Sequence, residues 1–359
     1  MKTKLLLIIA FITLNLAAQT ATPFVTGLVY QVGLQIKDNT LYFMQQGTTD
    51  AENIIYTVDI TATTPTATVF MDNVSPSNPY GMLLEGNMLY YSDLGGNVFV
   101  TDITDTNHTI TQVISGIQRC NGLAIRNNYL YISTFDTGKI IKLNLNDTFP
   151  TTATDVFTGL SGPASIAFNG DELYISGAYN GDDGIHKINV TDTTPAITTV
   201  VIGDSVLGKI RFIGNEMYYM QVLGAPKLIK IDITDAFPPT KTDVVIDLGV
   251  PLGFVFDGND IYITEYYSGI SKFTQNTVSV QDTNLNTIAI YPNSTTDFIT
   301  VNGLENEQNY TVYSVLGKHL LQGKISNQTP INVSMLPKGI YFLNIKGENK
   351  NFTKKFIKL

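Results

Sequence analysis

Leu130-Tyr131-Ile132 is one copy of a short motif that recurs six times along this chain and decides its fold. Each copy has an apolar residue, a tyrosine, and then an aromatic residue or isoleucine. The other copies are Leu41-Tyr42-Phe43, Leu89-Tyr90-Tyr91, Leu173-Tyr174-Ile175, Met217-Tyr218-Tyr219 and Ile261-Tyr262-Ile263. Successive copies are 48, 41, 43, 44 and 44 residues apart, and a Gly, Asn or Asp turn precedes each one. The chain therefore repeats one structural unit, a pattern typical of solenoids and propellers.

Four short strands are expected in each unit. In the third unit they are Gly122–Ile125 before the turn, the motif itself, Ile140–Leu143 after a polar loop, and Asp155–Phe157. Short strands with frequent turn residues indicate an all-β architecture. Four strands in a period of about 40–50 residues are typical of the blades of a β-propeller.

The N-terminus favours a closed ring over a linear solenoid. Phe24–Leu28 matches Val156–Leu160 at an offset of 132 residues, which is three repeats of 44. The mature chain would thus begin with the fourth strand of a blade, and the last unit, residues 253–273, lacks one. We therefore expect a six-bladed β-propeller over residues 19–280, in which the N-terminal strand closes the last blade. Residues 277–280 are the competing candidate for that strand.

The repeat resembles the six-bladed propellers of the NHL and gluconolactonase (senescence-marker) type over roughly residues 22–275. This likeness rests on the period and the tyrosine motif, so it implies a fold. Gluconolactonase-type enzymes hold a divalent metal with a Glu, an Asn and an Asp at the channel mouth. Suitable loops here carry Glu265 and Asn121, with Asp136 or Asp93 to complete the set, but the surrounding motifs do not match.

Residues 1–18 have the pattern of a secretory signal peptide. Lys2 and Lys4 form a basic start, Leu5–Leu16 is apolar, and Ala17-Ala18 supplies the small residues of a cleavage site before Gln19. The apolar run is shorter than the ~20 residues that a spanning helix needs. Since no other stretch is long and apolar enough, we expect no transmembrane segment.

The repeat stops near Ile288, and a different β pattern follows. We expect a linker at 281–288 and a small Ig-like antiparallel β-sandwich at 289–359, with turns at Gly317 and Gly339. Its most distinctive stretches are Tyr291-Pro292-Asn293, Leu316-Gly317-Lys318, Leu336-Pro337-Lys338-Gly339-Ile340-Tyr341 and Lys355-Phe356-Ile357-Lys358.

These stretches closely resemble the type A C-terminal sorting domain of the type IX secretion system, apart from Ser294, where that family usually has a second proline. The resemblance implies a Bacteroidetes-type cell, contact with the secretion machinery and removal of the tail. The product would be released or attached to the outer-membrane surface. The sorting signal would include Tyr291, Pro292, Asn293, Gly317, Lys318, Gly339, Tyr341, Lys355 and Lys358.

Charge and cysteine content exclude some functions. Residues 19–288 carry 12 Lys and Arg against 27 Asp and Glu, a net charge of −15. Such an acidic domain repels phosphates, so nucleic-acid binding is not expected. Cys120 is the single cysteine of the chain, which leaves no internal disulfide to form.

Candidate ligand residues lie on the loops that join strands four to one and two to three, because both sets reach the same end of a propeller. The first set carries Tyr80, Arg119, Cys120, Asn121, Pro163 and Lys209. The second set carries Asp93, Asp136, Tyr179, Asn180, Asp182, Asp183, Glu265, Tyr266 and Tyr267. Carboxylates, amides and aromatic rings suit Ca²⁺ or a sugar. The preferred ligand-binding candidates are Asp93, Asn121, Asp136, Asp182, Glu265 and Tyr266, and the alternative for each is an ordinary solvated turn.

Two further motifs favour a structural explanation. The stretch Asn180–Gly184 resembles a fragment of a Ca²⁺ loop but lacks the downstream acidic residue, so a hairpin turn is expected. The repeated Asp/Asn-x-Thr, such as Asp102-Ile103-Thr104, suits turns in which the side chain bonds to the backbone.

No catalytic residues are predicted. His108, His186 and His319 share no metal-ligand spacing, and no nucleophile stands beside a base. The leading hypothesis is an exported propeller that binds an extracellular ligand, glycan or partner without chemistry and needs no cofactor, apart from Ca²⁺ as a secondary hypothesis. The alternatives are a metal-dependent hydrolase of the lactonase kind and a structural or adhesive surface protein.

Overall fold

The computed structural model describes residues 19–49, 52–204, 208–275, 289–292, 294–302, 304, 306–314, 317–346 and 351–359. The chain divides into two compact units, residues 1–276 and 277–359. The signal peptide, the candidate strand at 277–280 and the linker at 281–288 lie outside the described residues. Those three assignments, and with them the proposed domain boundaries, stay predictions.

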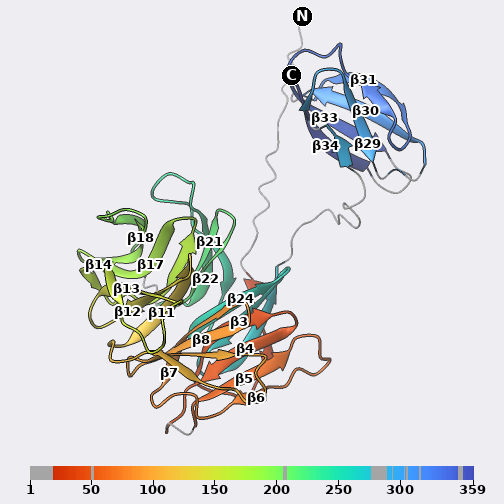
Figure 1. The fold of residues 1–359 in the computed structure, drawn as a ribbon. Coiled ribbons are helices and arrows are strands. Elements are labelled where there is room, and N and C mark those ends of the chain that lie inside the picture. Colours follow the sequence, from red (N-terminus) through yellow and green to blue (C-terminus); the bar gives the residue numbers. More distant parts are fainter. Residues whose placement is uncertain are drawn as a thin grey trace, which may run out of the picture. The chain divides into compact units, whose positions relative to one another are not determined.

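The described part of the first unit is built from six small sheets that follow one another along the chain (Figure 1). Blade one contains β3 (Gln31–Lys37), β4 (Thr40–Gln45), β5 (Ile54–Asp59) and β6 (Thr68–Met71). Blade two contains β7 (Pro79–Glu85), β8 (Met88–Asp93), β9 (Val98–Asp102) and β10 (Thr111–Ile114). Blade three contains β11 (Cys120–Arg126), β12 (Tyr129–Thr134), β13 (Lys139–Asn144) and β14 (Thr154–Thr158).

The remaining blades vary this plan slightly. Blade four contains β15 (Leu160–Ser161), β16 (Ile166–Asn169), β17 (Glu172–Tyr179), β18 (Asp182–Asn189) and β19 (Thr198–Ile202). Blade five contains β20 (Ile210–Ile213), β21 (Glu216–Gln221), β22 (Lys227–Asp232) and β23 (Thr242–Ile246). Blade six contains β24 (Pro251–Asp257), β25 (Asp260–Glu265) and β26 (Gly269–Thr274), and it takes its fourth strand from the N-terminus. The predicted six-bladed propeller is confirmed.

The repeated tyrosine motif forms the second strand of every blade. This strand has neighbours on both sides in its sheet and a further blade against each face, so consecutive residues are buried, as in Leu130, Tyr131 and Ile132. A strand covered on both faces reads as an unbroken apolar run instead of an alternating one. The core accordingly lies between blades: one cluster joins Tyr131 of blade three to Leu173 of blade four.

The N-terminal strand closes the ring, as predicted. β2 (Thr22–Val25) pairs antiparallel with β26, with Thr22 opposite Lys272 and Val25 opposite Ile270. Val25 is buried in a cluster that also contains residues of blades one and six. The sequence pattern did not predict β1 (Gln19–Thr20), which pairs in parallel with β23 of blade five.

The turn motifs have the structural roles that were expected. In Asp102-Ile103-Thr104 the carboxylate accepts hydrogen bonds from the Thr104 amide, at 2.8 Å, and hydroxyl, at 2.7 Å. The same pair of bonds recurs at three other blades, between Asp59 and Thr61, Asn189 and Thr191, and Asp232 and Thr234. The candidate Ca²⁺ loop Asn180–Gly184 consists of the two-residue hairpin turn between β17 and β18 and the first three residues of β18.

The second unit is a small sandwich. One sheet contains β27 (Ala289–Tyr291), β29 (Phe298–Asn302) and β32 (Pro330–Asn332). The other contains β28 (Ser294–Thr295), β34 (Asn351–Lys358), β33 (Gly339–Lys346), β30 (Gln308–Ser314) and β31 (His319–Ile325). A single core that includes Val301, Val312 and Phe356 lies between them. Within the described ranges of both units, no helix has the length and hydropathy of a membrane span.

Candidate functional site

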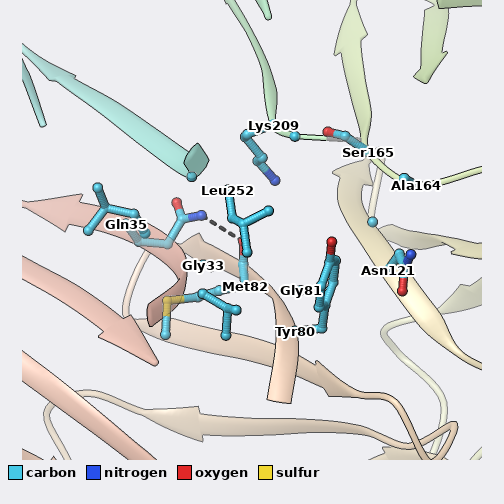
Figure 2. A pocket seen from close by; sticks show the side chains of 15 residues that line it. Gly33, Gln35, Tyr80, Gly81, Met82, Asn121, Ala164, Ser165, Lys209 and Leu252 are labelled. Atoms are coloured by element: carbon cyan, nitrogen blue, oxygen red, sulfur yellow. Dashed lines mark hydrogen bonds between the residues drawn. The ribbon is translucent and has the colours of Figure 1, made fainter. Parts of the chain in front are cut away.

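The first strands of all six blades enclose a central channel, and its narrow end is a cavity of about 40 Å³ (Figure 2). Gly81 and Gly122 make this end narrow, because the next blade leaves no room for a side chain. A Cβ on Gly81 would lie 2.4 Å from the carbonyl oxygen of Asn121, and one on Gly122 would lie 2.4 Å from that of Ala164. The narrow end coincides with the predicted ligand end, since Tyr80, Asn121 and Lys209 all line it.

Three of the polar side chains that line the narrow end are Asn121, Lys209 and Tyr80. Asn121 and Lys209 each have a polar atom without a hydrogen-bond partner among the described residues, and Tyr80 has a buried phenol. Asn121 is only 8% exposed, and its Oδ1 is buried without a hydrogen bond. The Lys209 ammonium points into the channel, and the structure assigns it no hydrogen bond or ion pair with a described residue (Figure 2). Burial raises the pKa of the Tyr80 phenol, which keeps it protonated. The narrow end therefore presents a donor, an acceptor and a cation to the channel.

Lys209 and Arg211 are the two cations of the channel. Lys209 immediately precedes β20 and Arg211 lies within it, and both line the channel. Arg211 donates from Nε to the Phe254 carbonyl at 2.6 Å and from Nη2 to the Leu34 carbonyl at 3.0 Å, which ties blade five to blades six and one. Burial, followed by the charge of Arg211, lowers the pKa of Lys209 to about 7. Burying the charged Lys209 side chain therefore lowers the free energy of unfolding.

Removing this charge should stabilise the protein in a pH-dependent way. In the unfolded chain Lys209 keeps its ordinary pKa of 10.5, whereas in the fold the pKa is about 7. Between these values the unfolded state binds more protons, so wild-type stability rises with pH, and below pH 7 the whole penalty remains. We expect Lys209→Met to be more stable than wild type by roughly 1–3 kcal/mol at pH 6, with little difference near pH 10. Urea unfolding of both proteins at several pH values measures this, and a pH-independent difference would contradict it.

Asp93 and Glu265 are held by internal hydrogen bonds. The Asp93 carboxylate is fully buried and accepts bonds from the Ser75 hydroxyl at 2.7 Å and the Asn97 amide nitrogen at 2.8 Å. Glu265 accepts bonds from the Gly249 amide at 2.7 Å and from the Ser271 hydroxyl. Both carboxylates thus fasten turns at the ends of second strands.

The other two acidic candidates lie apart at the surface. Asp136 forms an exposed ion pair with Arg119, with 3.3 Å between Oδ1 and Nη1. Asp182 is an exposed residue that follows the β17–β18 turn. Within the described residues no three His, Cys, Asp or Glu side chains are grouped to hold a metal ion. The set that the lactonase resemblance implies contains an Asn, which this grouping does not count, and Asp93, Glu265 and Asp136 are each bonded to other protein groups. The lactonase alternative therefore stays a hypothesis.

Cys120 is a fully buried residue of β11. Burial, with a smaller effect from the charge of Asp93, raises the pKa of its thiol to about 12. A protonated thiol is a poor nucleophile. The absence of catalytic residues stays a prediction.

Tyr266 belongs to a cluster of three tyrosines, with Tyr30 and Tyr267. The ring of Tyr266 lies 5.2 Å from that of Tyr30 and 4.9 Å from that of Tyr267. Its hydroxyl donates to Gln46 Oε1 at 2.8 Å. Tyr267 is 63% exposed, which is high for so large a ring. In this cluster the ring of Tyr266 is held in place by its hydrogen bond and its aromatic neighbours, and the ring of Tyr267 is open to solvent.

The predicted sorting residues are spread over the second unit. Tyr291 is 72% exposed in β27, and Pro292 follows it, whereas Asn293 lies outside the described residues. Gly317 has a φ of 76° in the turn that ends at Lys318. Gly339 begins β33, and the Tyr341 hydroxyl donates to the Pro337 carbonyl at 2.7 Å. Lys355 and Lys358 lie on β34.

Residues 289–359 match the family model of the secretion system C-terminal sorting domain. This match covers the whole sandwich beyond the propeller. The sorting domain indicates export to the cell surface or the extracellular space through the type IX system, and it implies contact with that secretion machinery. A comparison with curated proteins finds no match to the chain.

Solved structures share the fold of the propeller. The PQQ-bound aldose sugar dehydrogenase of Streptomyces coelicolor has a TM-score of 0.53 at 16% identity, over 69% of this chain and 95% of the other. A gluconolactonase of Xanthomonas campestris gives 0.52 at 11% identity, over 69% and 86%. A chain of the nidogen/laminin complex gives 0.51 at 14% identity, over 63% and 85%. Since these proteins differ in function, the likeness establishes the fold alone.

Arg211, Tyr30 and Gln46 were missed as candidates by the sequence argument. Tyr30 and Gln46 precede and follow the first two strands of blade one, where the argument singled out no ligand residue. Arg211 lies within the first strand of blade five, whereas the predicted ligand residues all lie on loops. The spacing of Lys209 and Arg211 was the available signal, because two cations two residues apart at the start of an otherwise apolar inner strand are expected on the same side of it.

Proposed function

We propose that this chain is an exported, non-catalytic binding protein that recognises a glycan outside the cell. The recognition site is the tyrosine cluster of Tyr30, Tyr266 and Tyr267 at the end of the propeller where the predicted ligand loops lie. The observation that carries the proposal is the 63% exposure of Tyr267, whose ring is backed by the ring of Tyr266 at 4.9 Å. Secretion machinery would then remove the signal peptide and sorting domain and leave the propeller at the outer-membrane surface or in the medium.

The chemistry of the cluster suits a sugar. A tyrosine offers an apolar face and a polar hydroxyl, the combination that favours partly wet interfaces. Tyrosine also gives a large contact area for little lost conformational entropy. Tyr266 is already fixed through Gln46, whose Nε2 donates to the Pro79 carbonyl at 2.9 Å. A sugar ring stacking on Tyr267 would meet a preorganised surface.

Backbone strain at Tyr30 supports a role beyond packing. Its φ of 63° lies in the left-handed region, which costs a non-glycine residue roughly 1 kcal/mol or more. Hydrogen bonds to the Tyr266 carbonyl and from the Gln46 amide hold it there. Strained residues of this kind gather at binding sites, where the surrounding structure over-determines them.

Affinity electrophoresis tests the proposal. The purified protein is run through native gels that each contain one soluble polysaccharide, namely xylan, laminarin, mannan, pectin or hydroxyethyl cellulose. We expect retardation by at least one of them, and Tyr267→Ala should abolish it without changing stability, because the ring is exposed. Tyr129→Ala is the matched control, since Tyr129 is 37% exposed at the opposite end of its blade. Glycan binding by this cluster would be refuted if the protein migrates freely in every gel. It would also be refuted if Tyr267→Ala and Tyr129→Ala lose retardation to the same extent.

A further inference from the structure

The channel widens at the end opposite the tyrosine cluster into a cavity of about 380 Å³. It is lined by residues of the first strand of every blade, together with Lys209 just before β20, and most of them are apolar. Phe168, Phe212 and Phe256 occupy equivalent positions in blades four, five and six, and each remains partly exposed. A volume of this size lies within the range of small-molecule sites.

The aromatic wall of this cavity is rigid. Phe168 packs edge-on against Tyr131 of the preceding blade, with 5.0 Å between ring centroids. Phe212 and Phe256 meet the equivalent tyrosines of their preceding blades, each at 4.8 Å. The partly exposed aromatic rings around this cavity form an apolar surface, and contact between water and such a surface is unfavourable. A ligand with an apolar body would gain free energy by covering it.

The floor of the cavity is basic. Lys209 lines both the wide and the narrow cavity, and Arg211 lines the wide one. The Nη1 group of Arg211 has no partner among the described residues, because its hydrogen bonds run from Nε and Nη2. Glu85 is the one carboxylate among the residues that line this cavity, and it is exposed at the mouth. Two cations without a carboxylate partner are unusual in a domain whose net charge is −15.

We propose that the wide end of the channel binds a small amphipathic anion, a carboxylic acid with an apolar body of about 8–12 carbons. The carboxylate meets Lys209 and the free Nη1 of Arg211, and the chain lies along Phe168, Phe212 and Phe256. A bound carboxylate supplies the negative charge that Lys209 and Arg211 lack among their described protein neighbours. This site is separate from the tyrosine cluster and goes beyond the proposed glycan binding.

Calorimetric titration with decanoate, below its micelle concentration, tests this assignment. We expect decanoate to bind at least about tenfold more tightly than decanol, which lacks the charge, and than acetate, which lacks the apolar body. Decylamine, which carries the opposite charge, should not bind. Equal affinity for decanol would overturn the ionic part of the proposal, and equal affinity for acetate would overturn the apolar part.

Variants separate the ionic contact from general packing. Lys209→Met, which we expect to fold more stably than wild type, should weaken decanoate binding about tenfold or more, the loss expected for one charge-assisted contact. Lys209→Arg keeps the charge and should retain binding within about threefold. Glu85→Gln is the matched control, and its affinity should stay equal or become tighter. Decanoate binding that is unchanged in Lys209→Met would refute the site.

The two proposals fail independently. Tyr267→Ala should leave decanoate binding intact, and Lys209→Met should leave polysaccharide retardation intact. A protein that is retarded by a polysaccharide but ignores decanoate keeps the glycan function and loses the anion site. The reverse pattern keeps the anion site and removes the glycan function.

Discussion

Deletion of residues 19–25 is expected to open the propeller and to remove most of its stability. The deletion takes away β2, which completes blade six, together with β1, which adds an edge to blade five. β26 would then expose an unpaired edge, and the core cluster around Val25 would lose its N-terminal contribution. We expect a loss of at least about 4 kcal/mol, a large part of the stability of an ordinary domain, and aggregation through the open edge.

A point variant keeps this prediction testable if the deleted protein cannot be purified. Val25→Asp buries an unpaired carboxylate in the same cluster and should cost roughly 3 kcal/mol. Val29→Ala is the control, because Val29 is 45% exposed and should tolerate truncation. Urea unfolding monitored by circular dichroism measures all three proteins.

One result would reassign the closing strand. Residues 277–280 were the competing candidate, and deleting them should leave the unfolding midpoint unchanged. If that deletion unfolds the propeller while the loss of residues 19–25 is tolerated, the ring is closed from the C-terminal side.

Gly122→Val is expected to have the second large effect. Its Cβ would lie 2.4 Å from the Ala164 carbonyl and 2.9 Å from the Ile166 amide, both backbone atoms of blade four. The clash cannot be relieved by rotating a side chain, and a closed ring resists moving a whole blade. The substitution would also disturb Ser133, which accepts from the Gly122 amide at 2.7 Å and donates to the Ala164 carbonyl at 2.6 Å. We expect a loss of about 4 kcal/mol or more, as for severe overpacking with a broken hydrogen-bond link.

A second glycine separates crowding from backbone strain. Gly170 has a φ of 62° and open space around the position of a Cβ, so Gly170→Ala should cost only about 1 kcal/mol through its conformation. Gly122 has no positive φ, and its cost is therefore steric. Similar midpoints of denaturation for Gly122→Val and Gly170→Ala would show that the blades can separate, contrary to our expectation.

The repeat made the architecture predictable because a propeller blade is a local unit. Each motif such as Leu173-Tyr174-Ile175 lies in a strand that is buried on both faces, and this burial leaves an unbroken apolar signature. The match of Phe24–Leu28 to a fourth strand was equally visible, because the same packing position selects similar residues. β1 was missed because two residues along the edge of another blade impose no pattern.

The candidate site was less predictable, and Asp93 illustrates the reason. A carboxylate at the end of a second strand looks the same in sequence whether it holds a ligand or fastens a turn. In the fold, Ser75 and Asn97 occupy its oxygens. Ser75 comes from a loop 18 residues earlier, so no local pattern indicates the pairing.

The sequence by itself determined the six blades, the strand that closes them and the exported nature of the chain, because strand periodicity, turn chemistry and sorting signals are all local. Only the tertiary structure decided which side chains enter the channel. The first strands of four blades contain register shifts near their start, for example between Cys120 and Leu123 and between Pro251 and Gly253. A bulge of this kind reverses which residues face the axis, so simple alternation does not predict it. Packing of the blades around one axis then brings Lys209 and Arg211 beside the inner strands of blades six and one, at positions far from them in sequence.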